Sequence, residues 1–238
     1  MLAGHTGDRG RRQSMLFMTV PTSGNRSNLL ENLVRDSGLP PDRVIVVTTR
    51  PNAQVPSGVV SISDAGPLNI HRWWNRGIDE AIRRGATAVA VVNDDVAIDE
   101  ETFSVLENAL LSTGAAIASP SRPPFHDGLH KRRLIPYEPR LWGSLWVLRI
   151  DSGLRPDERY GWWFGDNDLD IRARRNHGGI VLCDVTFTHL HPSEQTGTDP
   201  QLRKQTEIDA QTFERQYASL LRRSRFVTRW QQRLGLGK

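Results

Sequence analysis

The chain has 238 residues, 37% of them hydrophobic, with a formal net charge of +4, and this favours one compact domain plus a tail. A single cysteine, Cys183, excludes a disulfide framework and a cysteine-based zinc site, and it favours a reducing, cytoplasmic location. The sequence has no run of 18 apolar residues, so we expect no membrane span, and the small net charge argues against nucleic acid as a partner.

The first half of the chain alternates apolar runs with amphipathic stretches. Residues 1–14 are polar and unpatterned, and we predict a disordered leader there. Strands are predicted at 15–20, 44–49, 59–63 and 86–92. Helices are predicted over 29–38, capped by Asn25 or Ser27, and over 70–84 and 99–111. The run at 44–49 does not alternate, which is typical of a parallel strand covered on both faces, and the order predicts an α/β domain with a mostly parallel sheet.

The second half continues this pattern as far as residue 192. Further strands are predicted at 115–119, 141–150 and 180–190. Residues 122–140 are rich in proline and basic residues and predict a long surface loop, functional or solvated. Residues 193–238 predict a basic helical extension, with seven basic residues and no acid from 215 onward. We expect 213–238 to pack on its own domain with its charges in water; peripheral membrane or partner contact is the alternative.

Polar residues follow the predicted strands at their carboxyl ends, where open α/β sheets bind ligands. These ends carry Pro21-Thr22, Thr48-Thr49-Arg50, Asp64 and Asn93-Asp94-Asp95. Two adjacent acids at the tip of a buried strand repel each other unless a cation neutralises them. A hard divalent cation does so, commonly through one or two carboxylates plus substrate phosphates, and a simple Asx turn is the alternative. The glycine-rich dinucleotide loop and the P-loop are both missing, because PTSGN follows the first strand.

The stretch 161–174, GWWFGDNDLDIRAR, places three carboxylates between an aromatic run and a basic run. We predict a helix capped by Asp166 or Asn167 that ends at Gly178-Gly179. Acids at a helix start beside aromatics form a plausible acid/base site, since limited hydration shifts their pKa. The alternative is a plain amphipathic helix with an Asp170–Arg174 pair. A calcium loop is excluded, since its sixth position would be Ile171 and its twelfth His177.

Two histidines, His189 and His191, end the last predicted strand. At i and i+2 they point the same way, and imidazole is a common metal ligand. Surface histidines are the alternative.

Four segments, in this order, resemble glycosyltransferases of the GT-A fold, most closely family 2-like members of the rhamnosyltransferase type. They are MTVPTSGNRSNLLENL, NIHRWWNRGIDEAIRRGATAVAVVNDDV, GSLWVLRIDSGLRPDERYGWWFGDNDLDIRARRNHGG and the strand ending in HLH. The resemblance covers residues 15–192. It implies a Rossmann-like nucleotide-diphospho-sugar transferase domain there, followed by the C-terminal helical extension.

The resemblance also implies roles for the acids. Asn93-Asp94-Asp95 stands in the position of the family's DxD motif, with Asn93 replacing the first Asp. Asn167-Asp168 aligns with the Glu-Asp pair, which gives Asp168 the position of the catalytic base. Asp166 takes that role if the register is off by one turn residue. Asp170 and Arg174 match the structural Asp and Arg that follow.

The remaining site residues follow from the same comparison. The expected metal ligands for Mn²⁺ or Mg²⁺ are Asp95, His191, His189 and Asn93. The expected substrate or nucleotide contacts are Pro21, Thr22, Asn25, Arg26, Thr49, Asp64, Asn75, Arg76, Asp94, Trp142, Gly143 and Trp163. Thr49 stands where many members have an Asp for the nucleotide base, and Asp64 is the substitute candidate.

The sequence is therefore interpreted as a metal-dependent, inverting glycosyltransferase. Its donor would be a UDP-, GDP- or dTDP-linked sugar, and its acceptor a hydroxyl of a glycan, lipid or protein. Two alternatives stay open: a catalytically degenerate carbohydrate-binding or scaffold protein, suggested by Asn93 and Thr49, and a sugar nucleotidyltransferase-like enzyme.

Overall fold

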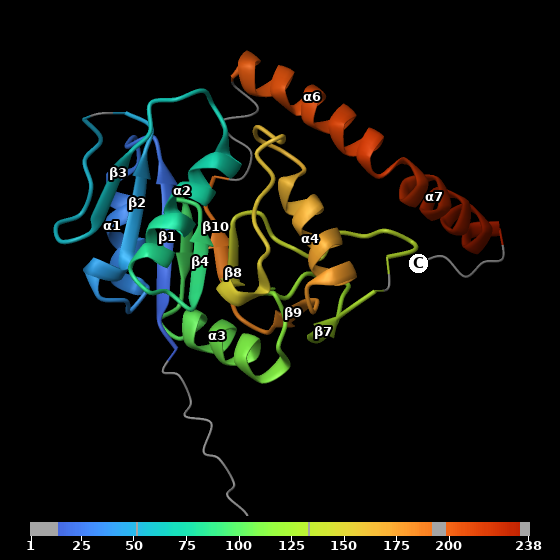
Figure 1. The fold of residues 1–238 in the computed structure, drawn as a ribbon, viewed down its shortest axis with the longest axis horizontal. Coiled ribbons are helices and arrows are strands. Elements are labelled where there is room, and N and C mark those ends of the chain that lie inside the picture. The colour runs from blue at the N-terminus through green and yellow to red at the C-terminus, as the bar shows by residue number, and fades with distance from the viewer. Residues whose placement is uncertain (1–13, 51, 133, 192–198, 234–238) are drawn as a thin grey trace, which may run out of the picture.

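A computed structural model describes residues 14–50, 52–132, 134–191 and 199–233. Within this part of the chain, eight strands form one sheet in the order β3-β2-β1-β4-β8-β6-β9-β7, and β10 and β5 form a second, two-stranded sheet (Figure 1). The strands are β1 Leu16–Thr22, β2 Val44–Thr48, β3 Val60–Ser63, β4 Ala88–Val92, β5 Val96–Ile98, β6 Ile117–Pro120, β7 Gly128–His130, β8 Leu145–Arg149, β9 Ile180–Cys183 and β10 Phe187–His189. The α-helices are α1 Ser27–Asp36, α2 Ile70–Arg83, α3 Thr102–Thr113, α4 Gly165–Asn176, α6 Pro200–Gln216 and α7 Ala218–Arg233.

The sheet is mixed but mostly parallel. Strands β1, β2, β3 and β4 pair parallel to one another, and β6 pairs parallel to β9. Strand β8 runs antiparallel between β4 and β6, and β7 closes the edge antiparallel to β9. The carboxyl ends of β1, β2, β3 and β4 therefore meet at one edge of the sheet, as the sequence predicts.

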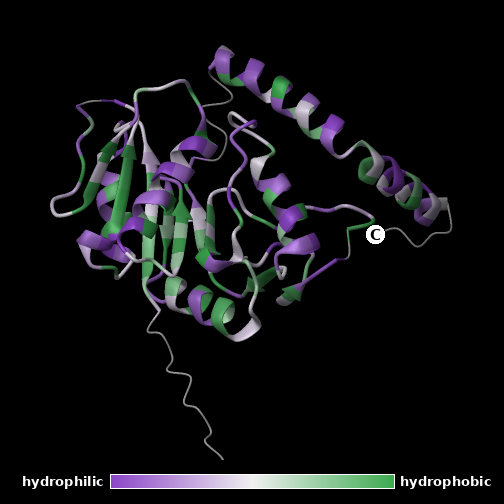
Figure 2. Ribbon diagram, in the orientation of Figure 1, coloured by the Kyte–Doolittle hydropathy of each residue, from purple (hydrophilic) through white to green (hydrophobic). Residues whose placement is uncertain are grey.

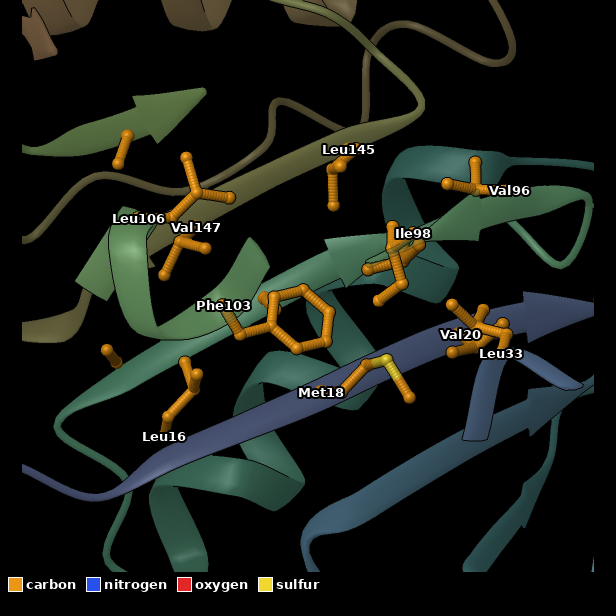
Figure 3. Packing of buried hydrophobic residues seen from close by; sticks show 14 of the residues in the cluster. Leu16, Met18, Val20, Leu33, Val96, Ile98, Phe103, Leu106, Leu145 and Val147 are labelled. Carbon is orange, nitrogen blue, oxygen red and sulfur yellow. The ribbon is translucent and has the colours of Figure 1, made fainter. Parts of the chain in front are cut away.

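Hydrophobic side chains cover the sheet on both faces. On one face Leu16, Met18 and Val20 of β1 pack with Phe103 and Leu106 of α3 (Figure 3). On the opposite face lie Phe17 of β1 and residues of α2 and α4, with Trp73, Trp74 and Leu169 among them. Alternate residues of one strand thus enter two cores, which explains why these runs show no apolar–polar alternation. Figure 2 shows the strands as the most hydrophobic part of the fold.

The C-terminal helices α6 and α7 pack beside α4, along one side of the domain (Figure 1). Phe213, Tyr217 and Leu220 are buried and pack with Tyr160 and Ile171 in a third apolar cluster. Asp199 caps α6 and accepts hydrogen bonds from its first-turn N–H groups. Within residues 199–233, which lie in the predicted helical extension, two helices pack on the domain. Among the described residues, none of the helices combines the length and apolar character needed to cross a membrane.

Several local predictions are wrong. Residues 180–190 form two strands, because a tight turn after Cys183 (Val185 N to Cys183 O, 2.8 Å) sends β10 into the second sheet with β5, which the sequence analysis missed. The loop 122–140 contributes β7 to the sheet edge. Helix α1 begins after Arg26, with no side-chain cap from that residue. Residues 1–13 of the predicted leader lie outside the described residues, while Ser14 hydrogen-bonds to Glu107.

Candidate functional site

The turn after β4 places two buried carboxylates at the edge of the sheet. Asp94 and Asp95 are 8% and 4% exposed. Thr22, at the end of β1, donates a hydrogen bond to Asp94 Oδ2 (2.6 Å), and Arg26 Nη1 lies 2.6 Å from Asp95 Oδ2 and 3.6 Å from Asp94 Oδ1. His189 Nε2, from the second sheet, is 3.1 Å from Asp95 Oδ1. The segment 22–26 and His189, both distant in the sequence, thus converge on this acidic pair.

The two carboxylates differ in their electrostatics. Burial raises the pKa of Asp94 above its usual value, and the neighbouring Asp95 charge adds to this effect. Burial also acts to raise the pKa of Asp95, but the hydrogen bond and charge of His189, together with the Arg26 charge, outweigh it and lower that pKa. Asp95 is therefore the more firmly ionised carboxylate, held by the Arg26 guanidinium and the His189 ring.

The other strand ends line the same edge. The Thr49 N–H donates to Thr22 O at 3.1 Å, which joins the ends of β1 and β2. Asp64, just after β3, accepts a hydrogen bond from Arg72 (2.8 Å), and Arg76 Nε lies 3.8 Å away. Asn25, next to Arg26, accepts a hydrogen bond from Arg50 (2.8 Å). The edge thus carries several guanidinium groups, each paired with a carboxylate or bonded to a side-chain amide. Pro21 is buried within β1.

The residues present fit a divalent cation only in part. Asp95 and His189 offer an ionised oxygen and an imidazole nitrogen side by side, which are acceptable ligands for Mn²⁺. Within the described residues, however, no group of three or more His, Cys, Asp or Glu side chains is positioned to hold a metal. Asn93 is tied by its N–H to Ser144 O (3.0 Å), and His191 lies exposed beyond the end of β10. Any metal bound here would need substrate oxygens to complete its shell.

Asp166 lies in the first turn of α4, and the pKa of its carboxyl group is raised. Burial raises the pKa of Asp166 to about 6. Its side chain lies against the backbone of Gly143, where an added Cβ would come within 3.1 Å of Asp166 Oδ2. The predicted cap at Asp166 or Asn167 is wrong, because α4 begins after Phe164, which has a left-handed φ of 67° and makes no side-chain cap bond. Phe164 stacks on Phe213 of α6 (ring centroids 5.3 Å apart), which supports this strained residue.

Residues 143 and 144 join the two acidic groups. Ser144 O accepts the Asn93 N–H, at the turn that carries Asp94 and Asp95, while Gly143 packs against Asp166. Trp142, the preceding residue, contacts Phe187 of β10 edge-on (5.5 Å between ring centroids) and lies under the guanidinium of Arg122. The segment before β8 thus lies against residues of both predicted motifs, the turn after β4 and the start of α4.

Asp168 lies in a different environment from Asp166. It is fully buried and accepts hydrogen bonds from Arg172 Nε (2.7 Å), Gln216 Nε2 (2.9 Å) and the Tyr217 hydroxyl (2.6 Å). These donors come from α4 itself and from the junction of α6 and α7. The carboxylate thus anchors the C-terminal helices. Asp166, the second of the two sequence candidates, is only half-buried and accepts a hydrogen bond from the Asn167 N–H (2.9 Å).

The Asp170–Arg174 pair expected on α4 is present and buried. Arg174 Nη2 lies 2.5 Å from Asp170 Oδ2, at 2% and 0% exposure of the two residues. Asp170 Oδ1 also accepts the Arg140 N–H at 3.1 Å, so the pair fixes Arg140 to α4. Asn75, expected to contact substrate, instead donates to Glu158 Oε1 (2.8 Å) and Pro156 O (3.1 Å). Its role here is to hold the loop before the aromatic run.

Sequence reasoning missed two groups that shape the site. Asp209 of α6 is fully buried and accepts the backbone N–H groups of Gly161 (2.9 Å), Trp162 (2.7 Å) and Trp163 (2.9 Å). One carboxylate thus holds the aromatic run in place. Asp209 gives no signal in the sequence beyond being an acid on a helix.

The second missed group is His71 of α2. Burial lowers the pKa of His71 to about 4, so the ring is neutral at pH 7. Its Nδ1 lies 2.8 Å from Tyr160 O, and a Cβ on Gly165 would come within 1.9 Å of its Nε2. Glycine at the first position of α4 is therefore required for the helix to approach α2.

Comparison with solved structures identifies the fold. Neither a protein-family model nor a curated protein matches this chain. The crystal structure of S. aureus TarS 1–349 superposes with a TM-score of 0.56 at 14% identity, over 85% of this chain and 72% of that chain. The same fragment in complex with UDP gives 0.54 at 14% identity (86% and 72%), and in complex with UDP-GlcNAc 0.52 at 13% (85% and 72%). The likeness shows the fold, and the GT-A fold class is confirmed.

Proposed function

We propose that this chain is a nucleotide-sugar glycosyltransferase whose donor site is the Asp94–Asp95 edge and whose general base is Asp166. The observation that carries the proposal is the segment 143–144, which touches both groups. A transferase needs its leaving-group site and its base on either side of one reacting carbon. The structural neighbour that was solved with UDP and UDP-GlcNAc supports a UDP-linked sugar as the donor.

In this reaction the acceptor hydroxyl gives its proton to the Asp166 carboxylate as its oxygen attacks the anomeric carbon. The bond from that carbon to the diphosphate oxygen breaks, and the nucleoside diphosphate leaves with the electron pair. A carboxylate with a pKa of about 6 is ionised at neutral pH yet basic enough to accept a proton. Direct displacement by the acceptor inverts the configuration at the anomeric carbon.

Positive charge at the donor edge supports departure of the diphosphate. The Arg26 guanidinium, which contacts Asp95, lies where the charge of the leaving group would collect. Asp95 and His189 would hold Mn²⁺ or Mg²⁺, which when bound would supply Lewis-acid stabilisation of the leaving diphosphate. The half-buried rings of Trp162 and Trp163 would cover sugar faces and limit water.

The finer parts of the proposal are supported by sequence. The four motifs support transfer of a hexosyl group by a rhamnosyltransferase-type member, and the single cysteine supports a cytoplasmic location. Thr49 and Asp64 would contact the nucleotide base, because they directly follow β2 and β3 at the same edge of the sheet.

A thermal-shift panel tests the proposal. UDP-, GDP-, dTDP- and CDP-sugars are each added with Mn²⁺ or with EDTA. One nucleotide class is expected to raise the Tm, since a ligand at 100 times its Kd stabilises by about 2.7 kcal/mol. The metal requirement is supported if EDTA abolishes the shift. Asp95→Asn should lose the shift, and Asp79→Asn, an exposed acid on α2, should keep it. No shift with any donor in either condition would contradict the proposal.

A degenerate, non-catalytic protein is the second candidate. The observation that favours it is Arg26, which lies 2.6 Å from Asp95 and supplies the positive charge that a metal would otherwise supply. Such a protein would bind the donor with or without EDTA and release no nucleoside diphosphate in the presence of any acceptor. Release of UDP that depends on Asp166 would exclude it.

A further inference from the structure

The outward face of α7 carries aromatic side chains among arginines. Phe226 and Trp230 are 68% and 57% exposed, and they lie about one helical turn apart on the same face. With successive residues about 100° apart, Arg222 and Arg229 fall beside them, and both are exposed. Large exposed aromatics in adjacent turns are unusual on the surface of a soluble domain.

The opposite face of α7 is packed against the domain, so the orientation of the helix is fixed. Leu220 and Ser224 are buried, and the Ser224 hydroxyl accepts the Tyr137 N–H at 2.6 Å. Tyr217, the residue just before α7, is buried as well. The exposure of Phe226 and Trp230 therefore results from a docked helix that presents its second face outward.

The surroundings of this face are basic. The sequence from 215 to 238 has seven basic residues and no acid. Beside α7, Arg132, Arg175 and Arg223 line a surface pocket together with Ser219. Arg223 belongs to both the pocket and the helix, so the pocket continues the basic surface. Guanidinium groups around a pocket of this kind suit phosphate oxygens.

From these observations we propose that the outer face of α7 binds an anionic phospholipid surface. Phe226 and Trp230 enter the boundary between headgroups and acyl chains, while Arg222 and Arg229 contact lipid phosphates beside them. The pocket of Arg132, Arg175 and Arg223 takes a further headgroup phosphate. Exposed aromatics flanked by arginines, on a segment with no acid from residue 215 onward, suit the interface of an anionic phospholipid surface.

This inference is independent of the transferase activity, and vesicle sedimentation tests it. The full chain is mixed with phosphatidylcholine vesicles, with or without phosphatidylglycerol. We expect it to sediment with the anionic vesicles only and to be released by high salt. The double variant Phe226→Ala/Trp230→Ala should bind about tenfold or more weakly, and Arg222→Gln/Arg229→Gln similarly. Leu111→Ala, which removes an exposed apolar side chain of α3 (59% exposed), is the matched control and should bind as wild type.

Three results would overturn the proposal. The first is no sedimentation of the wild-type chain with anionic vesicles. The second is sedimentation that neither double variant weakens, because binding would then lie elsewhere on the chain. The third is a dimer in size-exclusion chromatography that the Phe226→Ala/Trp230→Ala variant converts to a monomer, with no vesicle binding by either. That result would assign the face to a second copy of the chain. Circular dichroism of each variant confirms that the helices are intact.

Discussion

The two carboxylates Asp166 and Asp168, only two residues apart on α4, have different surroundings. Asp168 is fully buried and has three donors from Arg172, Gln216 and Tyr217. Asp166 is partly exposed, lies against the bare backbone of Gly143, and has a pKa that burial raises to about 6. A carboxylate saturated with donors stabilises structure, whereas one with few donors and a raised pKa is available for proton transfer. Spacing along the sequence does not distinguish the two.

The largest expected effect is the loss of activity when Asp166 is replaced. Asp166→Asn should lower kcat by about 10²–10⁴-fold, the usual contribution of a general base. Its Tm at pH 7.5 should not fall, because the variant removes a charge whose burial is unfavourable. Activity assays and calorimetry on the same preparation measure both quantities. The exposed Asp79→Asn should change neither. Retained activity in Asp166→Asn would return the role of base to Asp168.

The next largest effect is on the unfolding free energy, at the buried Asp170–Arg174 pair of α4. Asp170→Asn leaves the buried Arg174 without its ionic partner, and such changes cost about 3–5 kcal/mol of unfolding free energy. Urea unfolding measures the loss. Asp151→Asn, which disrupts the exposed ion pair with Arg149, is the control and should change stability little. Equal stability of the two variants would show that the pair on α4 does not stabilise the packing of Arg140.

Asp209 of α6 is a third buried carboxylate, and it holds the segment 161–163 that precedes α4. Asp209→Asn weakens the three hydrogen bonds that hold the segment 161–163, at a cost of about 1–3 kcal/mol. If Trp162 and Trp163 cover the acceptor, its KM should rise several-fold while donor affinity stays unchanged. Glu207→Gln, an exposed acid on the same helix, is the matched control. A uniform loss of kcat with unchanged KM would argue against a positioning role.

The last effects expected are those of pH. Activity should fall about tenfold per pH unit below pH 6, as Asp166 becomes protonated. The folded-state pKa of this acid lies above its unfolded value, so the folded state binds the proton more tightly. Its contribution to stability is present below about pH 4 and is lost as pH rises through 6, by about 1–3 kcal/mol. Asp166→Asn should remove this part of the pH dependence in thermal unfolding; an unchanged profile would contradict the assignment.

The sequence predicted the interior strands β1, β2 and β4 well, because they are buried on both faces and appear as continuous apolar runs. It also placed α2 and the C-terminal helices. It missed β5 and β7, which are three residues long and are defined by their partners rather than by local pattern. The caps of α1 and α4 were wrong, since tertiary contacts set Arg26 and Phe164 at those positions in place of polar caps.

The acidic turn was predictable from one motif, Asn93-Asp94-Asp95, and the family resemblance supplied His189, which the structure places beside Asp95. It was not predictable where a partner lies far away in the sequence. Asp209 and Tyr217 reach the 161–172 segment only because α6 folds across it. For that reason the choice between Asp166 and Asp168 required the structure.

Calorimetric titration of the donor into three proteins tests the central claim most directly: wild type, Asp95→Asn and Asp166→Asn, each with Mn²⁺ and the nucleotide sugar that the thermal-shift panel selects. The account predicts that Asp166→Asn binds the donor like wild type but does not turn it over, while Asp95→Asn loses most of the binding. Donor binding unaffected by Asp95→Asn, or abolished by Asp166→Asn, would contradict a leaving-group site at the end of β4 with its base on α4.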